Sequence, residues 1–588
     1  MKKTLLLAAL IGCTCLTQAQ DTFVELTDHI QPTAEDWKEV KNIRAAWGTS
    51  DVRYAWHEMP NTEALNKKET LTAWRGERVS AQALIYSGVA TDSLAPISVE
   101  LSSFKSGRNT LPADAVKASF VRYVKTDSWK RTDNGRGDGC GRRPDRTVFD
   151  SAMVADIIDI HAKTMPMEAM STRSVWVSCQ VPADAVPGIY SGTLNIKAGK
   201  RSVAKLPLQI EVLSHTLPAP KDWEFHLDLW QNPFTEARYY NTPLWSEAHF
   251  EAMRPSIEML AAAGQKVITT TLNKDPWNHQ CYDAYEDMIR WTLRKDGSWS
   301  YDYTNFDRWV EMMLTTGINK MINCYSMVPW NCELHYMDEA KGEMVTVKAE
   351  PGKPIFNDMW SPFLKDFKQH LQQKGWLSIT NIAMDERSPE QMDAAAKLLQ
   401  ECAPELGFAL ADNHNSYKRY TMMNDVCAAL RRQLVDHEDI VMRRAKNQNT
   451  TFYVCCGPYF PNTFTWSQPY EAEMLGWLNV TYDYDGMLRW AYNSWPSDPQ
   501  MDSRFGSWPA GDTYLTYPQC RSSLRFERLI DGIESAEKVR RLRAAGVDIS
   551  DVEAMLTKIR NTDFLDHKQS WLEIIKQARA TLDEASRK

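Results

Sequence analysis

The feature that most constrains the fold is a repeated alternation of short apolar strands and amphipathic helices between residues 216 and 535. Phe250, Met253, Ile257 and Leu260, for example, recur at helical spacing directly after a strand-like run. The predicted strands are EFHLDLW, KVITTTL, KMINCYSM, LSITNIAM, FALADNH, TTFYVCCG and GMLRWAYNSW. The segment between FALADNH and TTFYVCCG reads as helix-bearing. Such alternation favours a (β/α)8 TIM-like barrel over a doubly wound sheet.

The regions on either side of the predicted barrel have different patterns. Residues 20–215 contain short β-forming runs separated by Gly, Pro, Asp and Asn, which predicts a β-sandwich domain. The Pro-containing stretch 214–223 links it to the barrel, and residues 536–588 read as a helical C-terminal segment. The turn at 295–299 and the hairpin-like stretch 332–357 read as insertions in βα loops. We therefore expect a multidomain β plus α/β protein.

The N-terminus is typical of an exported protein. Lys2 and Lys3 precede the apolar run LLLAALIG, and Ala19 occupies a small-residue cleavage position. This pattern predicts a signal peptide over residues 1–19 and a periplasmic or secreted protein. The alternative is a lipoprotein box that would leave a lipid anchor at Cys13. No later apolar run is long enough for a transmembrane segment.

Charge and motifs narrow the classes of partner. The formal net charge of -8 argues against nucleic acid as a partner. The sequence contains no HExxH, P-loop or GxGxxG motif, so we expect neither a metal site nor a cofactor. The 22 Trp residues are consistent with core packing, with sugar-binding platforms, or with both.

Polar and aromatic residues gather where the predicted barrel strands end, which is where the active site of such a barrel lies. These strand ends combine carboxylate, amide and aromatic side chains, the inventory of a carbohydrate pocket. For each residue alone, a buried polar contact or core packing is the alternative. Besides Asn273 and Asp412, the predicted substrate-binding residues are His226, Asp228, Trp230, Tyr325, Asn413, His414, Tyr459, Trp490, Tyr492 and Trp495.

Two adjacent acids, Asp385 and Glu386, follow the strand LSITNIAM and are the predicted catalytic residues. Ser388, Pro389 and Gln391 form an N-terminal capping signature, so a helix should begin directly after the pair. The strand is therefore expected to end near Met384, which would free both acids from strict strand alternation. The alternative is that the two acids only stabilise the helix N-terminus.

Adjacent carboxylates suit substrate-assisted glycoside hydrolysis in particular. In that mechanism the 2-acetamido group of the sugar is the nucleophile. One carboxylate orients this group while its neighbour protonates the leaving oxygen. Ordinary retaining glycosidases instead place their two acids on opposite sides of the scissile bond.

Three blocks of sequence resemble glycoside hydrolase family 123, the retaining β-N-acetylgalactosaminidases. They are AWRGERVSAQALI at 73–85, the MDERS turn, and the run from GDTYLTYP to SSLRFERLIDGIES at 511–535. The resemblance covers nearly all of the mature chain. It implies that Asp385 polarises the acetamido group and that Glu386 is the general acid and base. The continuation GIESAEKV departs from the family pattern, which leaves the preference between galacto and gluco sugars open.

The resemblance implies an exo-acting enzyme that removes terminal β-linked N-acetylgalactosamine from glycolipids or glycans through an oxazolinium intermediate. One alternative is a non-catalytic glycan-binding protein on a barrel scaffold. Another is a β-hexosaminidase or other glycosidase of different specificity, such as a conventional two-carboxylate enzyme that uses Asp228 with Glu386.

Overall fold

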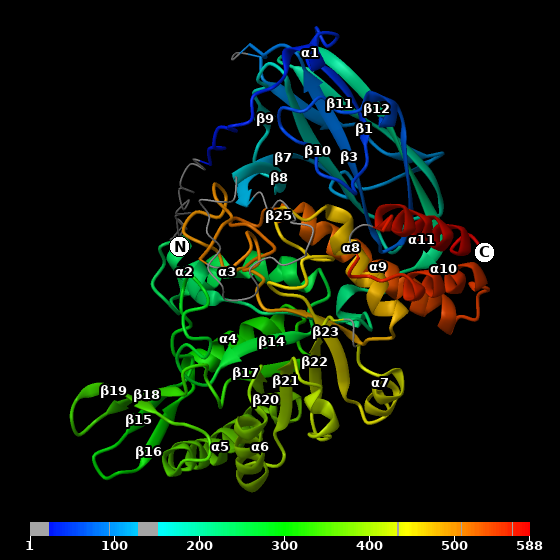
Figure 1. Ribbon diagram of the computed structural model, residues 1–588. Coiled ribbons are helices and arrows are strands. Elements are labelled where there is room, and N and C mark those ends of the chain that lie inside the picture. The colour runs from blue at the N-terminus through cyan, green and yellow to red at the C-terminus, as the bar shows by residue number, and fades with distance from the viewer. Residues whose placement is uncertain (1–22, 93–94, 128–150, 432–433, 507, 567–568) are drawn as a thin grey trace, which may run out of the picture.

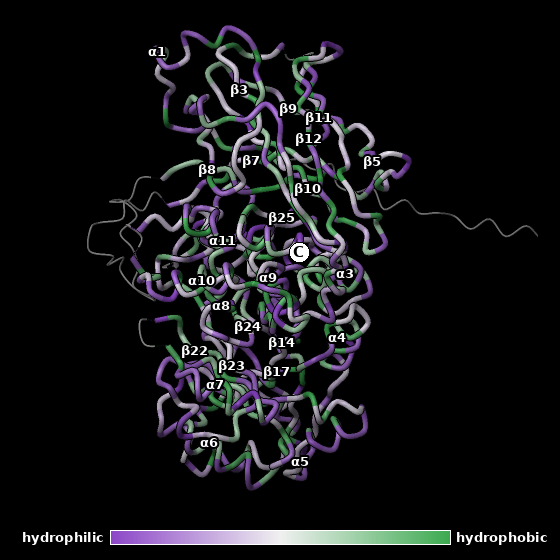
Figure 2. Tube along the Cα trace, turned by 90° about the vertical axis from the view of Figure 1, so that its right-hand side faces the viewer, coloured by the Kyte–Doolittle hydropathy of each residue, from purple (hydrophilic) through white to green (hydrophobic). Residues whose placement is uncertain are grey.

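The computed structural model describes residues 23–588 except 93–94, 128–150, 432–433, 507 and 567–568. The predicted signal peptide and Cys13 lie outside the described residues. Figure 1 shows a region of strands at the top, a barrel with its helices at the bottom, and C-terminal helices at the right. Figure 2 places α8 (Pro469–Thr481) and α9 (Leu524–Ala544) between the strand region and the barrel. The predicted fold class is confirmed.

Two sheets build the N-terminal region. The first contains, in spatial order, β1 (Arg44–Gly48), β3 (Arg78–Ser87), β10 (Ser171–Gln180), β7 (Val116–Asp127), β8 (Ser151–Asp159) and β25 (Ser522–Ser523). The second contains β2 (Glu69–Arg75), β12 (Arg201–Thr216), β11 (Gly188–Ala198), β4 (Ile97–Leu101) and β9 (Thr164–Met165), with β5 (Lys105–Ser106) and β6 (Asn109–Thr110) beside β11. Trp47, Val175, Leu194 and Leu208 are among the buried side chains that both sheets contribute to a common core.

Eight parallel strands form the barrel. In chain order they are β13 (His226–Leu229), β14 (Val267–Thr271), β17 (Met321–Tyr325), β20 (Thr380–Asp385), β21 (Gly407–Asp412), β22 (Asp425–Ala429), β23 (Asn449–Tyr453) and β24 (Gly486–Arg489). Strand β22 was missed in the segment predicted as helix-bearing. Its sequence DVCAA is short and rich in alanine, which has a low strand propensity, so neighbouring strands rather than local preference set its conformation.

The barrel closes between β13 and β14 largely through side-chain amides. The backbone contributes a bridge between Leu227 and Gln265, with the Lys266 N–H donating to the Leu227 carbonyl at 2.9 Å. The Gln265 amide then accepts from the Leu229 N–H at 2.9 Å and donates to the Val267 carbonyl at 2.7 Å. Because Gln265 is buried, its amide satisfies backbone groups that water cannot reach.

Helices surround the barrel and continue past it. They are α2 (Pro233–Tyr239), α3 (Glu247–Ala261), α4 (Thr304–Thr315), α5 (Pro354–Lys374), α6 (Pro389–Cys402), α7 (His437–Arg444), α8 and α9, then α10 (Ser550–Asn561) and α11 (Trp571–Ala585), with the short α1 (Ala34–Trp37) near the N-terminus. Phe356, Trp360, Phe363 and Phe367 form one buried face of α5. Among the described helices, none combines the length and apolarity needed to cross a membrane.

The two predicted insertions come together in a separate four-stranded sheet, here called the insertion sheet. It comprises β15 (Arg290–Leu293), β16 (Trp299–Asp302), β18 (Glu333–Asp338) and β19 (Glu343–Lys348). Figure 1 shows it projecting from the barrel at the lower left. Asn273, predicted as a pocket residue, instead ties this sheet to the barrel: its amide donates to the His335 carbonyl at 3.0 Å and accepts from the His335 N–H at 2.8 Å.

Candidate active site

The acid pair lies where β20 meets the following turn. Asp385 is the last residue of the strand and is paired with Ala411 of β21. Glu386 adopts a left-handed backbone conformation with φ of 46°, while its N–H still donates to the Ala411 carbonyl at 2.9 Å. The strand thus ends one residue later than predicted. The unusual φ of Glu386, rather than an early strand end, interrupts the alternation of the two side chains.

The predicted capping box directly after the pair is confirmed. The Ser388 hydroxyl accepts from the Gln391 N–H at 3.3 Å, and the Gln391 side chain accepts from the Ser388 N–H at 3.2 Å. Both interactions satisfy N–H groups that have no partner within the helix. Helix α6 therefore begins at Pro389, and neither Asp385 nor Glu386 lies within it.

Asp385 has an environment that favours its neutral form. Burial raises the pKa of its carboxyl to about 6, and the charge of Glu386 acts in the same direction. The Trp330 indole N–H, which donates to Asp385 Oδ2 at 3.1 Å, opposes this rise, as do Arg387 and Trp277. Asp385 therefore changes its charge in the mildly acidic range.

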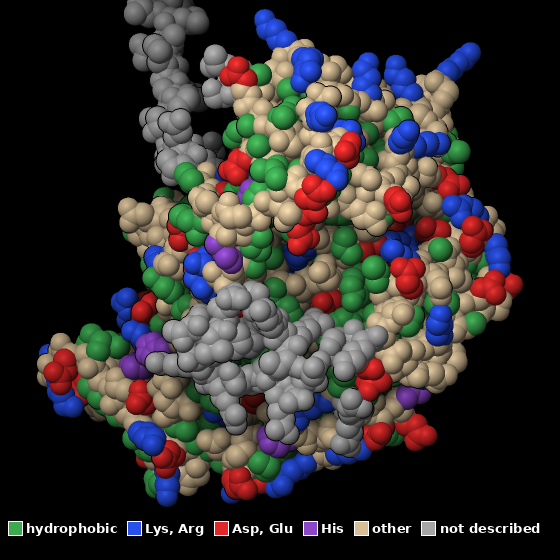
Figure 3. Space-filling view, turned by 45° about the horizontal axis from the view of Figure 1, so that its top comes forward, with side chains coloured by type: hydrophobic (Ala, Val, Ile, Leu, Met, Phe, Trp, Pro, Cys, Tyr) green, Lys and Arg blue, Asp and Glu red, His purple; other side chains and the backbone are tan. Residues whose placement is uncertain are grey.

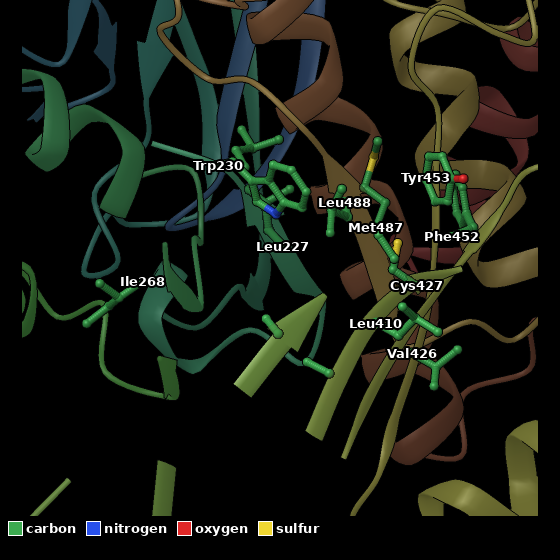
Figure 4. Close-up of a cluster of buried hydrophobic side chains, with 14 of the residues drawn as sticks. Leu227, Trp230, Ile268, Leu410, Val426, Cys427, Phe452, Tyr453, Met487 and Leu488 are labelled. Atoms are coloured by element: carbon green, nitrogen blue, oxygen red, sulfur yellow. The ribbon is translucent and has the colours of Figure 1, made fainter. Parts of the chain in front are cut away.

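Glu386 is held by a residue that the sequence analysis missed. The hydroxyl of Tyr453 donates a hydrogen bond to Glu386 Oε1. Tyr453 is the last residue of β23, so it lies at the C-terminal end of the barrel, as Figure 4 shows. The available signal was its place within the predicted strand TTFYVCCG, six residues before Tyr459, which was chosen instead.

Arg387 completes the turn and packs on Trp330. Its Nε donates to the Asp385 carbonyl at 2.6 Å, and its guanidinium lies 3.8 Å from the ring centroid of Trp330. This stacking positions the indole whose N–H reaches Asp385. Neither Arg387 nor Trp330 was predicted from the sequence.

An aromatic wall adjoins the pair. It consists of Trp230, Tyr325 and Trp277, of which the first two were predicted. The ring centroid of Trp230 lies 4.5 Å from that of Tyr325 and 5.0 Å from that of Trp277. Burial, followed by the charges of Asp228 and Asp385, raises the pKa of Tyr325 well above its usual range, so this phenol stays neutral. Figure 4 shows Trp230 near the same end of the barrel as Tyr453.

The predicted position of His226 at the C-terminal rim is wrong. His226 is the first residue of β13, and its Nε2 lies 3.9 Å from Oδ2 of Asp425, the first residue of β22. The contact is therefore at the N-terminal end of the barrel. The strand EFHLDLW was assigned correctly, but its observed span places His226 at the opposite end from the active site.

Asp228 is fully buried inside the barrel. Burial, reinforced by the charge of Asp425, raises the pKa of Asp228 well above its usual range. Both effects disfavour the ionised form of this carboxyl. This does not favour the alternative in which an ionised Asp228 is the partner of Glu386 in a conventional two-carboxylate mechanism.

Tyr492 and Trp495 make hydrogen bonds within the protein, and their contact with substrate stays a prediction. Both side chains are buried. The Tyr492 hydroxyl donates to the Ser256 carbonyl at 2.8 Å, and the Trp495 indole donates to the Thr516 carbonyl at 2.7 Å. The Tyr492 hydroxyl therefore binds α3, and the Trp495 indole binds the loop that follows β24.

The remaining predicted residues lie in loops after their strands. Tyr459 and Trp490 are half-buried, with ring neighbours in Trp466 and Trp508 respectively. Asn413 is half-buried and His414 is exposed. They occupy a turn in which the His414 N–H donates to Asp412 Oδ1 at 2.8 Å, so Asp412 serves the turn. Substrate contact by these four residues stays a prediction.

The chain is similar over most of its length to known proteins. Residues 230–542 match the family model described as glycoside hydrolase 123, catalytic domain, and residues 47–198 match the glycoside hydrolase 123 N-terminal domain. A family 123 glycoside hydrolase from Clostridium perfringens, whose structure was analysed for the details of glycolipid glycan hydrolysis, is 23% identical. It matches with a TM-score of 0.83 over 93% of this chain and 98% of that chain.

Other comparisons are weaker. A family 39 glycoside hydrolase from Bacteroides cellulosilyticus WH2 is 8% identical, with a TM-score of 0.33 over 76% of this chain and 82% of that chain. No curated protein sequence matches the chain. The catalytic-domain match alone spans more than half of the chain and includes Asp385 and Glu386. The chain therefore belongs to glycoside hydrolase family 123.

Proposed function

We propose that this family 123 glycoside hydrolase releases terminal β-linked N-acetylgalactosamine from glycolipids or glycans, acting from the chain end with retention of configuration. The observation that carries the proposal is the pair Asp385 and Glu386, adjacent in sequence and bound by different partners. Trp330 donates to the first carboxylate and Tyr453 to the second. Two acids held side by side suit a reaction whose nucleophile comes from the substrate.

Each carboxylate has a distinct role in this mechanism. Ionised Asp385 accepts the N–H of the 2-acetamido group and stabilises the positive charge that develops as the acetamido oxygen attacks the anomeric carbon. Protonated Glu386 gives its proton to the leaving oxygen, and the resulting carboxylate later takes a proton from the attacking water. The hydroxyl of Tyr453 orients Glu386 throughout.

The aromatic wall backs the acid pair. Trp230, Trp277 and Tyr325 are at most 3% exposed and pack on one another beside Asp385, so they surround that carboxyl with an apolar environment. The choice of N-acetylgalactosamine over N-acetylglucosamine rests on family membership.

The test uses three aryl glycosides: the β-N-acetylgalactosaminide, the β-N-acetylglucosaminide and the β-galactoside. The rate at which each one releases its aryl group is measured. We expect the first to be the best substrate and the last, which lacks the acetamido nucleophile, to be inert. Asp385→Asn should lower kcat on the N-acetyl sugar by about a thousandfold because the amide cannot stabilise the developing charge. The control is Glu390→Gln, which removes an exposed carboxylate from the first turn of α6.

Three outcomes would contradict the proposal. Absence of release from either N-acetyl sugar at every pH tested, with glycan binding retained, would favour the non-catalytic binding protein. Equal turnover of the β-galactoside would favour a conventional two-carboxylate glycosidase. An inverted anomeric product by NMR would exclude the substrate-assisted route, because that route involves two successive inversions.

A further inference from the structure

A cavity of about 660 Å³ lies between the strand region and the C-terminal helices, and the acid pair is not part of its lining. The strand region contributes residues of the stretch 48–81, and α8, α9 and α11 contribute the rest of the wall. The exposed residues Asn66 and Thr70 belong to the lining, so the cavity is open to solvent. Its volume is in the range of sites for small molecules.

The charges on the cavity wall are unbalanced in favour of acids. Six acidic and five basic residues line it, but two of the basic ones pair with acids outside the lining: Lys576 with Glu573 at 3.2 Å and Arg78 with Glu527 at 3.5 Å. Figure 3 shows acidic and basic side chains intermixed at the right of the molecule, where Figure 1 places α10 and α11. The basic residues left to pair with the six lining acids are Arg528, Lys538 and Arg579.

Two of these three basic residues are already compensated. Arg528 and Arg579 pair with Asp51 at 2.8 and 2.7 Å, and each of them also contacts the Glu473 carboxylate. These two guanidinium groups and two carboxylates neutralise one another, so they do not attract an anionic ligand. The four lining acids that remain are Glu69, Glu77, Asp531 and Asp583.

These four acids are only partly compensated by basic neighbours. Asp531 shares Arg528 with the cluster just described, and Lys538 lies 2.9 Å from Glu77 and 3.7 Å from Asp583. Burial raises the pKa of all four carboxyls, that of Asp531 to about 6, and the neighbouring positive charges oppose this rise only in part. A cationic ligand would supply the positive charge that their ionised forms lack.

A buried hydroxyl on the same wall points to a ligand independently of the charges. Ser80 of β3 lines the cavity and is 8% exposed, and among the described residues its Oγ has no hydrogen-bond partner. A buried hydroxyl without a partner costs free energy, which an N–H group of a ligand would recover. An organic cation fits better than a metal ion, because the described part of the chain contains no group of three or more His, Cys, Asp or Glu arranged to hold a metal.

We propose that this cavity binds a small organic dication, a linear diamine or polyamine, between the strand region and the C-terminal helices. One ammonium group binds Glu69 and Glu77 and donates to the Ser80 hydroxyl, and the other binds Asp531 and Asp583. Because the ligand contacts both parts of the molecule, its binding stabilises their junction. The site goes beyond the proposed function, since it takes no part in glycoside hydrolysis.

The experiment uses calorimetric titration of the full chain at low ionic strength with three four-carbon compounds that differ in charge. Putrescine has two ammonium groups, butanediol is uncharged, and succinate has two carboxylates. We expect binding of putrescine alone. At about a hundredfold its Kd, putrescine should also raise the melting temperature by about 2 °C, because it binds the folded chain only.

Two variants locate the binding. Asp583→Asn should weaken putrescine binding about tenfold, because it removes one charge-assisted hydrogen bond. Ser80→Ala, which leaves every charge in place, should weaken it about threefold. The matched control is Glu584→Gln, an exposed acid that is the next residue of α11, pairs with Arg587 and does not line the cavity. Its affinity for putrescine should be unchanged.

Thermal melting without ligand checks that each variant folds. Absence of a binding heat with putrescine, or binding of butanediol or succinate at least as tight, would overturn the cationic site. Unchanged affinity in both Asp583→Asn and Ser80→Ala would place the binding elsewhere and would overturn it as well. None of these measurements depends on turnover, so failure of this site and failure of the proposed function are distinguishable.

Discussion

At the scale of single residues, Asp385 and Glu386 are neighbours in sequence with different surroundings. Asp385 ends a strand, and burial raises the pKa of its carboxyl to about 6. This carboxyl accepts a hydrogen bond from the Trp330 indole N–H. Glu386 has a left-handed backbone conformation, and its carboxylate accepts a hydrogen bond from the Tyr453 hydroxyl. A non-glycine residue with positive φ costs roughly 1–2 kcal/mol, and such strain is found where function depends on the position of a side chain.

The pH dependence of activity should report on Asp385. Because the mechanism needs its carboxylate, kcat/KM should fall as the pH drops below about 6, where Asp385 becomes protonated. Trp330→Phe removes a hydrogen bond that lowers this pKa, so the acid limb should move to higher pH by up to about one unit. The measurement is a pH profile of kcat/KM on the aryl substrate.

Trp299→Phe is the control for this shift, because it removes an indole of the insertion sheet whose ring packs on Trp291 and Tyr336. A purely structural role for Trp330 would reduce kcat/KM equally at all pH values. A limb that stays in place, or moves to lower pH, would show that the indole N–H does not stabilise the ionised carboxyl.

At the scale of elements, the junction between β13 and β14 differs from the other seams of the barrel. Side-chain amides replace part of the backbone hydrogen-bond ladder there. The Gln265 amide accepts from the Leu229 N–H and donates to the Val267 carbonyl. This seam lies next to Trp230, the residue that follows β13 and contributes to the aromatic wall.

Gln265→Leu should lower the free energy of unfolding by roughly 2–4 kcal/mol. The leucine leaves the buried Leu229 N–H and Val267 carbonyl without the partners that the amide provided. Chemical denaturation monitored by tryptophan fluorescence measures the change. The matched substitution Gln372→Leu, at an exposed position of α5, should change the stability by less than about 0.5 kcal/mol. A loss at residue 265 no larger than this would contradict the role of the amide.

At the scale of the whole molecule, buried charges connect the strand region with the barrel. Asp156 of β8 forms ion pairs at 3.0 Å with Arg53 and with Arg525 of α9, and it accepts from the Tyr517 hydroxyl at 2.6 Å. Arg525 also donates to the Gly511 carbonyl at 3.0 Å in the loop that follows β24. Strand β25 joins the N-terminal sheet directly before α9, so the two regions share an element.

We expect Asp156→Ala to destabilise the protein by roughly 3–5 kcal/mol, because it leaves two buried guanidinium groups without their shared carboxylate. Differential scanning calorimetry should show a single transition that moves to lower temperature, with activity lost over the same range. Asp184→Ala, at an exposed site in the same region, is the control. Two separate transitions, with only the first one shifted, would indicate that the strand region and the barrel unfold independently.

Part of the site was predictable because its signals are local. The Ser388 capping box, the strand before it and the adjacent acids are encoded within about a dozen residues, where periodicity and helix-capping rules apply. Other parts depend on packing. His226 lies in a correctly predicted strand but at the opposite end, and Trp495 is buried by loops from elsewhere in the chain.

The sequence by itself determined the alternation of strands and helices, the sandwich that precedes the barrel, and the acid pair at the end of one strand. Only the tertiary structure decided what surrounds that pair. The hydroxyl of Tyr453 lies 67 residues from Glu386 along the chain, and the indole of Trp330 lies 55 residues from Asp385. Such contacts follow from strand register and side-chain packing across the barrel. Local propensity contains no information about them, because it is set by hydrogen bonds and side-chain spacing within a few residues.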